Sequence, residues 1–146
     1  MTLAMRVLVI HGPNLNLLGE REPHIYGAQT LDEINEFIAA TARELSMDVD
    51  CVQYNGEGEI VSAIQDARTR YDGIVINPGA YSHYSYAIAD AIASISIPVI
   101  EAHLSNIAAR EAFRRTSVTA ATCTALISGL GARSYTLALR ALAQST

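Results

Sequence analysis

Short apolar runs alternate along the chain with longer segments in which apolar residues recur every three or four positions. The short runs are rich in Val and Ile and are bounded by Gly, Pro, Asn or Asp, which is typical of buried β-strands. An alternation of strands with helices predicts βαβ units around a parallel sheet. We therefore predict five strands, at residues 6–10, 48–53, 73–77, 98–103 and at or near 117–122.

The helical segments lie between these runs. Apolar residues at helical spacing over 31–45 predict the first helix, and Thr30 with Glu33 forms a capping box in front of it. The other helices are predicted at 60–67, 87–95 and 132–143, with a short piece near 106–113. A chain of this length buries one core and is too short for two ordinary domains, so we expect residues 1–146 to form a single domain.

The predicted sheet also indicates where a ligand would bind. A five-stranded parallel sheet is commonly doubly wound in the order 2-1-3-4-5, with its site beyond the carboxyl ends of the strands where the order reverses. In that order the first, third and fourth strands border the site. Residues 11–29 follow the first strand, and this segment is much longer than the usual ~2–6 residues of a strand-to-helix connection. We expect it to be a functional loop.

Composition excludes several classes of protein. Half of the 146 residues are apolar, and 15 acidic against 10 basic residues give a net charge of −5. The chain lacks the basic stripe that binds nucleic acid, and no apolar run approaches the roughly 18 residues that span a bilayer. The apolar run 5–10 leads into His-Gly-Pro-Asn rather than a small-residue cleavage site, so we expect no export. The high apolar content favours burial in an oligomer.

Cys51 and Cys123 lie in apolar, strand-like stretches and have no CxxC spacing. On opposite edge strands of the predicted sheet they would be about 19 Å apart at ~4.8 Å per strand, which is beyond disulfide reach. We therefore expect buried free thiols and a reducing, cytoplasmic compartment.

Polar residues are concentrated in three segments that directly follow the strands bordering the expected site. The segments are 12–27, 77–83 and 101–106. Because the carboxyl ends of parallel strands meet at one edge of a sheet, the three segments converge on one candidate pocket. This convergence predicts a site more strongly than any single residue does.

Glu101 and His103 are two residues apart at the end of a predicted strand. Period-two alternation puts both side chains on one face, where the carboxylate can orient the imidazole and stabilise its protonated form. Such a pair suits a general acid that works near neutral pH. A purely structural ion pair at the sheet end is the alternative interpretation.

Arg21 and Tyr26 lie on one glycine-flanked loop, where the chain can fold a guanidinium beside the phenol. A tyrosine normally ionises near pH ~10, and a cation at about 4 Å contributes roughly 4 kcal/mol at an effective dielectric of ~20. That interaction could make Tyr26 a base. The alternative is a tyrosine that only packs at the rim of the pocket.

Other chemistries lack their motifs. The four histidines show no HxxxH or HExxH spacing and have no paired cysteines, so we expect no metal. Neither GxGxxG nor GxxxxGK[ST] occurs, and no GxSxG surrounds a serine, so we expect no cofactor and no serine nucleophile.

Taken together and in this order, the polar segments resemble those of the type II 3-dehydroquinases. The resemblance covers almost every position of GPNLNLLGEREPHIYG at 12–27 and of EAHLSNIAAREAFR at 101–114, and it extends over nearly the whole chain. It implies a flavodoxin-like catalytic domain and the anti elimination of water from 3-dehydroquinate, through an enolate, to give 3-dehydroshikimate. It further implies a step of the shikimate pathway or of quinate breakdown, the absence of metal and cofactor, and homododecamers built as tetramers of trimers.

The resemblance also implies roles for individual residues. Tyr26 would take the proton alpha to the ketone, with Arg21 favouring its ionised form. His103, oriented by Glu101, would protonate the departing hydroxyl, and Asn14 would help to stabilise the enolate. The residues implied to hold the substrate are Asn77, His83 and Arg114 at the hydroxyls, Leu104 and Ser105 at the carboxylate, and Asp90 in the site of a neighbouring subunit.

Some positions depart from the family pattern in ways that affect pocket shape and assembly rather than chemistry. They are Tyr54, Gly56, Ser82, Tyr84 and Ala108. By the same resemblance, Arg110 would lie at an interface or order a loop.

Three other interpretations stay open. A flavodoxin-like mononucleotide-binding module would carry a bound flavin, a lyase for a related polyhydroxylated acid would use similar chemistry, and a non-catalytic paralogue would retain only the scaffold. The first strand is not followed by a phosphate-binding loop, which argues against the first interpretation. A base and an acid facing one pocket argue against the third.

Overall fold

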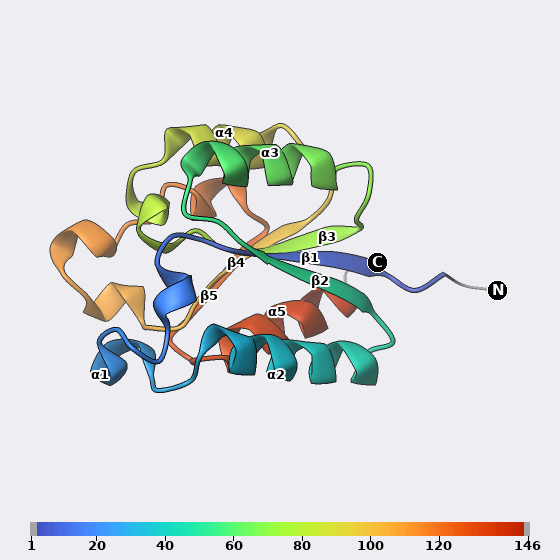
Figure 1. The fold of residues 1–146 in the computed structure, drawn as a ribbon. Coiled ribbons are helices and arrows are strands. Elements are labelled where there is room, and N and C mark those ends of the chain that lie inside the picture. Colours follow the sequence, from blue (N-terminus) through green and yellow to red (C-terminus); the bar gives the residue numbers. More distant parts are fainter. Residues whose placement is uncertain (1–2, 145–146) are drawn as a thin grey trace.

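The computed structural model describes residues 3–144, and its core is a five-stranded parallel sheet (Figure 1). The strands are β1 (Arg6–His11), β2 (Asp48–Gln53), β3 (Gly73–Asn77), β4 (Val99–His103) and β5 (Ala125–Ser128). Their order is β2-β1-β3-β4-β5, which confirms the predicted sheet order and the flavodoxin-like fold class. All five carboxyl ends therefore lie at one edge, and the order reverses beside β1 and β3.

Two helices cover each face of the sheet (Figure 1). One face carries α2 (Leu31–Glu44) and α5 (Arg133–Gln144), and the other carries α3 (Glu57–Ala67) and α4 (Tyr86–Ala93). Because both faces of β3 are covered, all of its residues are buried and its sequence is a continuous apolar run. The predicted capping box at Thr30 is present at the start of α2. No helix within residues 3–144 has the length and apolar character needed to cross a membrane.

The prediction of the fifth strand at 117–122 is wrong, because β5 begins only at Ala125. The segment contains three β-branched residues, Val118, Thr119 and Thr122, which favour a strand. However, the hydroxyls of Ser117 and Thr119 both donate to the buried carboxylate of Glu101. The segment is thereby held by side-chain hydrogen bonds instead of a strand ladder.

Cys51 lies on the edge strand β2, as predicted, but Cys123 precedes β5 instead of lying on it. Both cysteines are free, in agreement with the prediction, although each is only partly buried. Burial raises the pKa of Cys51 to about 11 and that of Cys123 to about 12. Both residues are therefore protonated thiols near neutral pH.

Short helical elements occur where the sequence shows no clear helical period. The expected helix near 106–113 consists of two 3-10 turns, Ile107–Ala109 and Ala112–Arg114. The long loop after β1 contains a 3-10 turn at Leu15–Leu17 and the single-turn helix α1 (Pro23–Tyr26). Elements of three or four residues are too short to show a 3.6-residue repeat, so the pattern could not predict them.

His11 ends β1 and is fully buried, and burial lowers its pKa from 6.5 to about 4. The folded protein therefore keeps the imidazole neutral between these pH values, while the unfolded chain binds a proton, so stability is lost as pH falls through the window. We expect His11 to lower the free energy of unfolding by about 3 kcal/mol from pH 7 to pH ~4.

This loss can be measured by urea denaturation at a fixed protein concentration, in the wild type and in the His11→Asn variant. The variant should lack this component of the pH dependence, because asparagine does not titrate. The same pH dependence in both proteins would contradict the assignment.

Candidate active site

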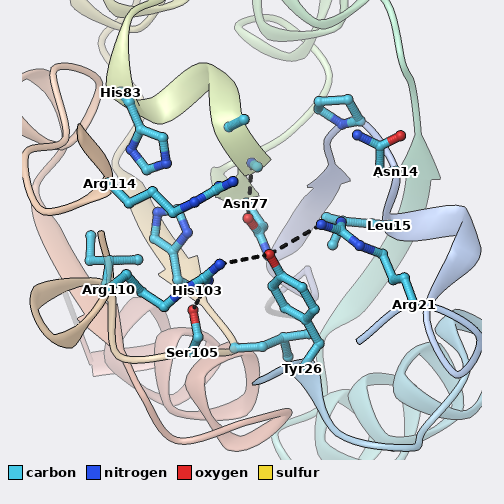
Figure 2. Close-up of a pocket in the computed structure, with 15 residues that line it drawn as sticks. Asn14, Leu15, Arg21, Tyr26, Asn77, His83, His103, Ser105, Arg110 and Arg114 are labelled. Carbon is cyan, nitrogen blue, oxygen red and sulfur yellow. Dashed lines mark hydrogen bonds between the residues drawn. The ribbon is translucent and has the colours of Figure 1, made fainter. Parts of the chain in front are cut away.

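A pocket of about 610 Å³, counting its open mouth, lies at the carboxyl ends of β1, β3 and β4 (Figure 2). All three predicted polar segments contribute to its lining. Two predicted residues do not line it: Glu101 lies behind His103, and Asp90 lies on the exposed surface of α4. The predicted residues that do line it are Asn14, Arg21, Tyr26, Asn77, His83, His103, Leu104, Ser105 and Arg114.

The loop after β1 packs closely against the end of β3. The Gly12 N–H donates to the Asn77 carbonyl at 2.7 Å, and a Cβ at Gly12 would lie 2.6 Å from the carbonyl carbon of Pro78. Only glycine permits this approach. Asn14 follows in a left-handed conformation (φ 69°), which asparagine tolerates better than most residues. The loop then forms α1, which ends at Tyr26 in the pocket.

The hydroxyl of Tyr26 accepts hydrogen bonds from two guanidinium groups (Figure 2). Arg21 Nη2 donates at 3.1 Å and Arg110 Nη2 at 3.2 Å. Their guanidinium carbons lie 4.3 and 5.2 Å from the centroid of the tyrosine ring. Two positive charges at this distance stabilise negative charge that develops on the phenol oxygen. The contact of Arg21 with Tyr26 was expected from the sequence, whereas the second cation was not.

Arg110 is held in place by two further side chains. It donates to Ser105 Oγ at 3.1 Å and to Glu111 at 3.3 Å. Glu111 also accepts from Arg114 Nε at 2.9 Å, so one carboxylate orients two arginines of the pocket. A backbone hydrogen bond within Glu111 itself, and then Arg114, lower the pKa of this carboxyl to about 2. Arg110 is 84 residues from Tyr26 in sequence, and no spacing rule reveals such a contact.

Glu101 and His103 form the pair predicted on one face of β4. Glu101 Oε2 lies 2.7 Å from His103 Nε2, and the carboxylate is fully buried. Ser117 donates to the same oxygen at 2.6 Å, and Thr119 donates to the other oxygen. A carboxylate held by three donors has one fixed orientation. Because Nε2 faces Glu101, Nδ1 is the ring nitrogen left for the pocket.

His83 contributes a second imidazole to the pocket. Partial burial and, next, the neighbouring Arg114 guanidinium lower its pKa, so the ring is neutral near pH 7. The Ser82 hydroxyl lies 3.0 Å from His83 Nδ1. A neutral imidazole offers one donor and one acceptor, which suits the hydroxyl groups of a ligand.

The pocket as a whole suits an anionic, hydroxylated ligand. Arg21, Arg110 and Arg114 line it, and the carboxylate of Glu101 is directed at His103 behind the lining. Tyr26 and His103 both line this cavity, so two side chains of the types used in proton transfer face the same ligand. Within residues 3–144, no group of three or more His, Cys, Asp or Glu side chains is placed to hold a metal ion.

Comparison with known proteins agrees with this geometry. Residues 5–143 match the family model described as dehydroquinase class II. The chain is 52% identical over 139 residues to the 3-dehydroquinate dehydratase of Pelotomaculum thermopropionicum, with 95% of this chain and 96% of that protein covered. It is 56% identical over 137 residues to the 3-dehydroquinate dehydratase of Caldanaerobacter subterraneus, with 94% and 93% covered. The crystal structure of a type II dehydroquinase from Butyrivibrio crossotus has a TM-score of 0.93 to this fold at 48% identity, covering 95% of this chain and 97% of that one. The chain therefore belongs to the class II dehydroquinase family.

Proposed function

We propose that Tyr26 and His103 are the general base and the general acid of this chain's hydro-lyase reaction, the dehydration of 3-dehydroquinate to 3-dehydroshikimate. One observation carries the assignment of roles. A phenol bonded to two guanidinium groups and an imidazole backed by a buried carboxylate line a single pocket. The family match does not favour a mononucleotide-binding module on the same fold.

The reaction begins with proton removal. The phenolate of Tyr26 takes the proton alpha to the substrate ketone, and the electron pair of the broken C–H bond moves onto the carbonyl oxygen as an enolate. Asn14, which lies in the loop after β1 and lines the pocket, donates toward that developing charge, directly or through a water. Arg21 and Arg110 stay in contact with the phenol throughout.

The second step expels the hydroxyl. The enolate collapses back to a ketone, a carbon–carbon double bond forms, and the C–O bond breaks as His103 delivers a proton to the departing oxygen. Anti elimination requires the base and the acid on opposite faces of the substrate. Afterwards Tyr26 holds one additional proton and His103 lacks one, so a proton passing between them through water restores the resting state.

The remaining lining residues hold the substrate without reacting. Asn77, His83 and Arg114 bind its hydroxyls, and the Leu104 backbone with the Ser105 hydroxyl binds its carboxylate. The pocket thus fixes both ends of the ring while the base and the acid act between them. No metal or cofactor enters this scheme.

We also propose that the chain works in the cytoplasm as a homododecamer, a tetramer of trimers. Large apolar side chains exposed on the single chain support burial between subunits: Tyr84, Tyr86, Phe113, Leu126 and Leu137. Asp90 lies on the exposed side of the same helix as Tyr86, where it could enter a neighbouring site.

Sharing of Asp90 between subunits makes a specific prediction for mixed assemblies. Tyr26→Phe and Asp90→Ala subunits should each be poorly active alone. Co-assembled at equal amounts, they should recover roughly a quarter of wild-type activity. In a random mixture, about that share of sites combines Tyr26 from one subunit with Asp90 from its neighbour. The measurement is turnover before and after subunits are mixed by dissociation and reassembly. Activity that stays at the mean of the two variants would place Asp90 outside any shared site.

Removal of Arg21 should change the pH dependence of the reaction. With one cation lost, negative charge on the base is less stabilised, so the acid limb of the kcat/KM profile should move to higher pH in Arg21→Ala. Arg21→Lys, which retains a charge, should move it less. A profile of unchanged shape in Arg21→Ala would show that the guanidinium does not act on the base.

The direct test of the activity is incubation of the purified protein with 3-dehydroquinate while the ultraviolet absorbance of the conjugated enone product is followed. Absorbance should rise with the wild type. No rise in any condition would reject the function, whereas equal rates in the wild type and Tyr26→Phe would reject only the proposed base.

A further inference from the structure

A continuous chain of hydrogen bonds leads from the pocket into the protein interior. It begins at Asn77 at the end of β3, whose Nδ2 lies 3.0 Å from the hydroxyl of Tyr135 on α5. The same hydroxyl lies 3.0 Å from Nδ1 of His11 at the end of β1. The chain ends at Asn35 on α2, whose Oδ1 lies 2.8 Å from His11 Nε2. Asn77 lines the pocket, while Tyr135 and His11 are fully buried and do not.

The hydrogen bonds of this network must all donate in the same direction, from Asn77 towards Asn35. The Gly79 N–H donates to Asn77 Oδ1 at 3.0 Å, so the amide nitrogen of Asn77 must face Tyr135 and donate to its oxygen. A tyrosine hydroxyl has one proton, which is then directed to His11 Nδ1. His11 must in turn carry its proton on Nε2 and donate it to Asn35.

The chemistry of the two buried residues is consistent with this direction. Burial raises the pKa of Tyr135, which therefore stays a neutral phenol that can donate. The lowered pKa of His11 keeps the imidazole neutral, so that Nδ1 can accept. A buried polar group without a partner is costly, at about 1–3 kcal/mol, so each member holds the next in one orientation.

We propose that Tyr135 and His11 are positioning residues, which lock the Asn77 amide so that its second Nδ2 proton is presented to the pocket as a donor. The Asn77 oxygen is occupied by Gly79, and one amide proton is occupied by Tyr135. The remaining Nδ2 proton therefore favours an acceptor oxygen at this point of the substrate, such as the lone pair of a hydroxyl group. The inference rests on the proposed contact of Asn77 with the substrate.

The direction of hydrogen-bond donation along this network can be tested without an activity assay, by ¹⁵N NMR of the histidine side chains. Wild-type His11 should show the neutral form with the proton on Nε2. In Asn77→Asp, the introduced carboxylate accepts from both Gly79 and Tyr135, so the tyrosine proton turns away from His11. His11 must then place a proton on Nδ1, and its ¹⁵N shifts should change accordingly.

The exposed His24 is the internal control, and its signals should not move. An unchanged His11 tautomer in folded Asn77→Asp protein would overturn the inference. It would show that the side chain at position 77 does not determine, through the Tyr135 hydroxyl, which nitrogen of His11 carries the proton.

Steady-state kinetics test whether this hydrogen-bond network contributes to substrate binding. Tyr135→Phe and His11→Leu each release the Asn77 amide, so KM should rise about 3- to 10-fold with kcat within about twofold, as expected for lost ground-state binding. His11→Asn should restore the wild-type KM, because its Oδ1 takes the place of Nδ1 as an acceptor. Tyr71→Phe is the matched control, since it removes a hydroxyl that donates to Asp50 and lies outside the pocket.

The positioning role of Tyr135 and His11 and the substrate contact of Asn77 can be distinguished by their variants. If Asn77→Ala raises KM while Tyr135→Phe and His11→Leu do not, the positioning role is wrong and the substrate contact stands. If Asn77→Ala leaves KM unchanged, the substrate contact itself is wrong, and the inference falls with it. If Tyr135→Phe does not fold, the comparison of His11→Leu with His11→Asn decides the same question.

Discussion

Replacement of Tyr26 by phenylalanine should lower kcat by about 10²- to 10⁴-fold, because the only group removed is the oxygen that takes the substrate proton. The ring remains, and with it the packing of the Arg21 and Arg110 guanidinium groups 4.3 and 5.2 Å from its centroid. KM should therefore change little, since the base acts mainly in the transition state. The measurement is steady-state turnover of 3-dehydroquinate by the purified variant.

Tyr84→Phe is a suitable control, because Tyr84 is 58% exposed and does not line the pocket. It loses the same oxygen and should keep wild-type kcat. If Tyr26→Phe retained turnover while its fold and KM were unchanged, another group would have to be the base.

Replacement of Glu101 by glutamine should have an effect of similar size. The amide cannot stabilise an imidazolium at His103, and kcat should fall by about 10²- to 10⁴-fold. The basic limb of the pH profile should also move to lower pH, because the acid loses its proton more readily without the neighbouring charge. The amide nitrogen takes the place of one of the two oxygens, so it faces a hydrogen-bond donor, either Thr119 or Ser117 with His103. The free energy of unfolding should therefore fall by about 1–3 kcal/mol.

Stability and catalysis can be separated by changing the donors instead of the carboxylate. Thr119→Val and Ser117→Ala each remove one hydrogen bond to Glu101 and keep the negative charge beside His103. They should lower stability while leaving the pH limits of activity in place. A folded Glu101→Gln protein with the wild-type pH profile would show that the carboxylate does not support the acid.

The predictions that the structure bears out depend on regular local patterns. The order of the sheet follows from the alternation of apolar runs with amphipathic segments and from the common topology of parallel sheets. The proximity of Glu101 to His103 follows from the two-residue period of a strand, and the start of α2 from its capping box. The contact of Arg21 with Tyr26 spans five residues of one loop, so the sequence could indicate it.

The wrong prediction of the fifth strand shows where such patterns fail. The stretch 117–122 contains three β-branched residues. However, the hydroxyls of Ser117 and Thr119 donate to the carboxylate of Glu101, which lies 16 residues before Ser117 and 18 before Thr119. A buried charge that needs hydrogen bonds outweighs the modest strand propensity of a few residues.

By itself, the periodicity of the sequence determined the layers, the strand order, the edge of the sheet that carries the site and the three segments that converge there. Most of the individual residues predicted to bind substrate followed from the family resemblance of these segments. Only the tertiary structure decided which groups meet across the fold. Arg110 reaches Tyr26 over 84 residues, Asn77 reaches Tyr135 over 58, and His11 reaches Tyr135 over 124. Such contacts depend on how helices and loops pack on the sheet, and local sequence spacing does not encode that packing.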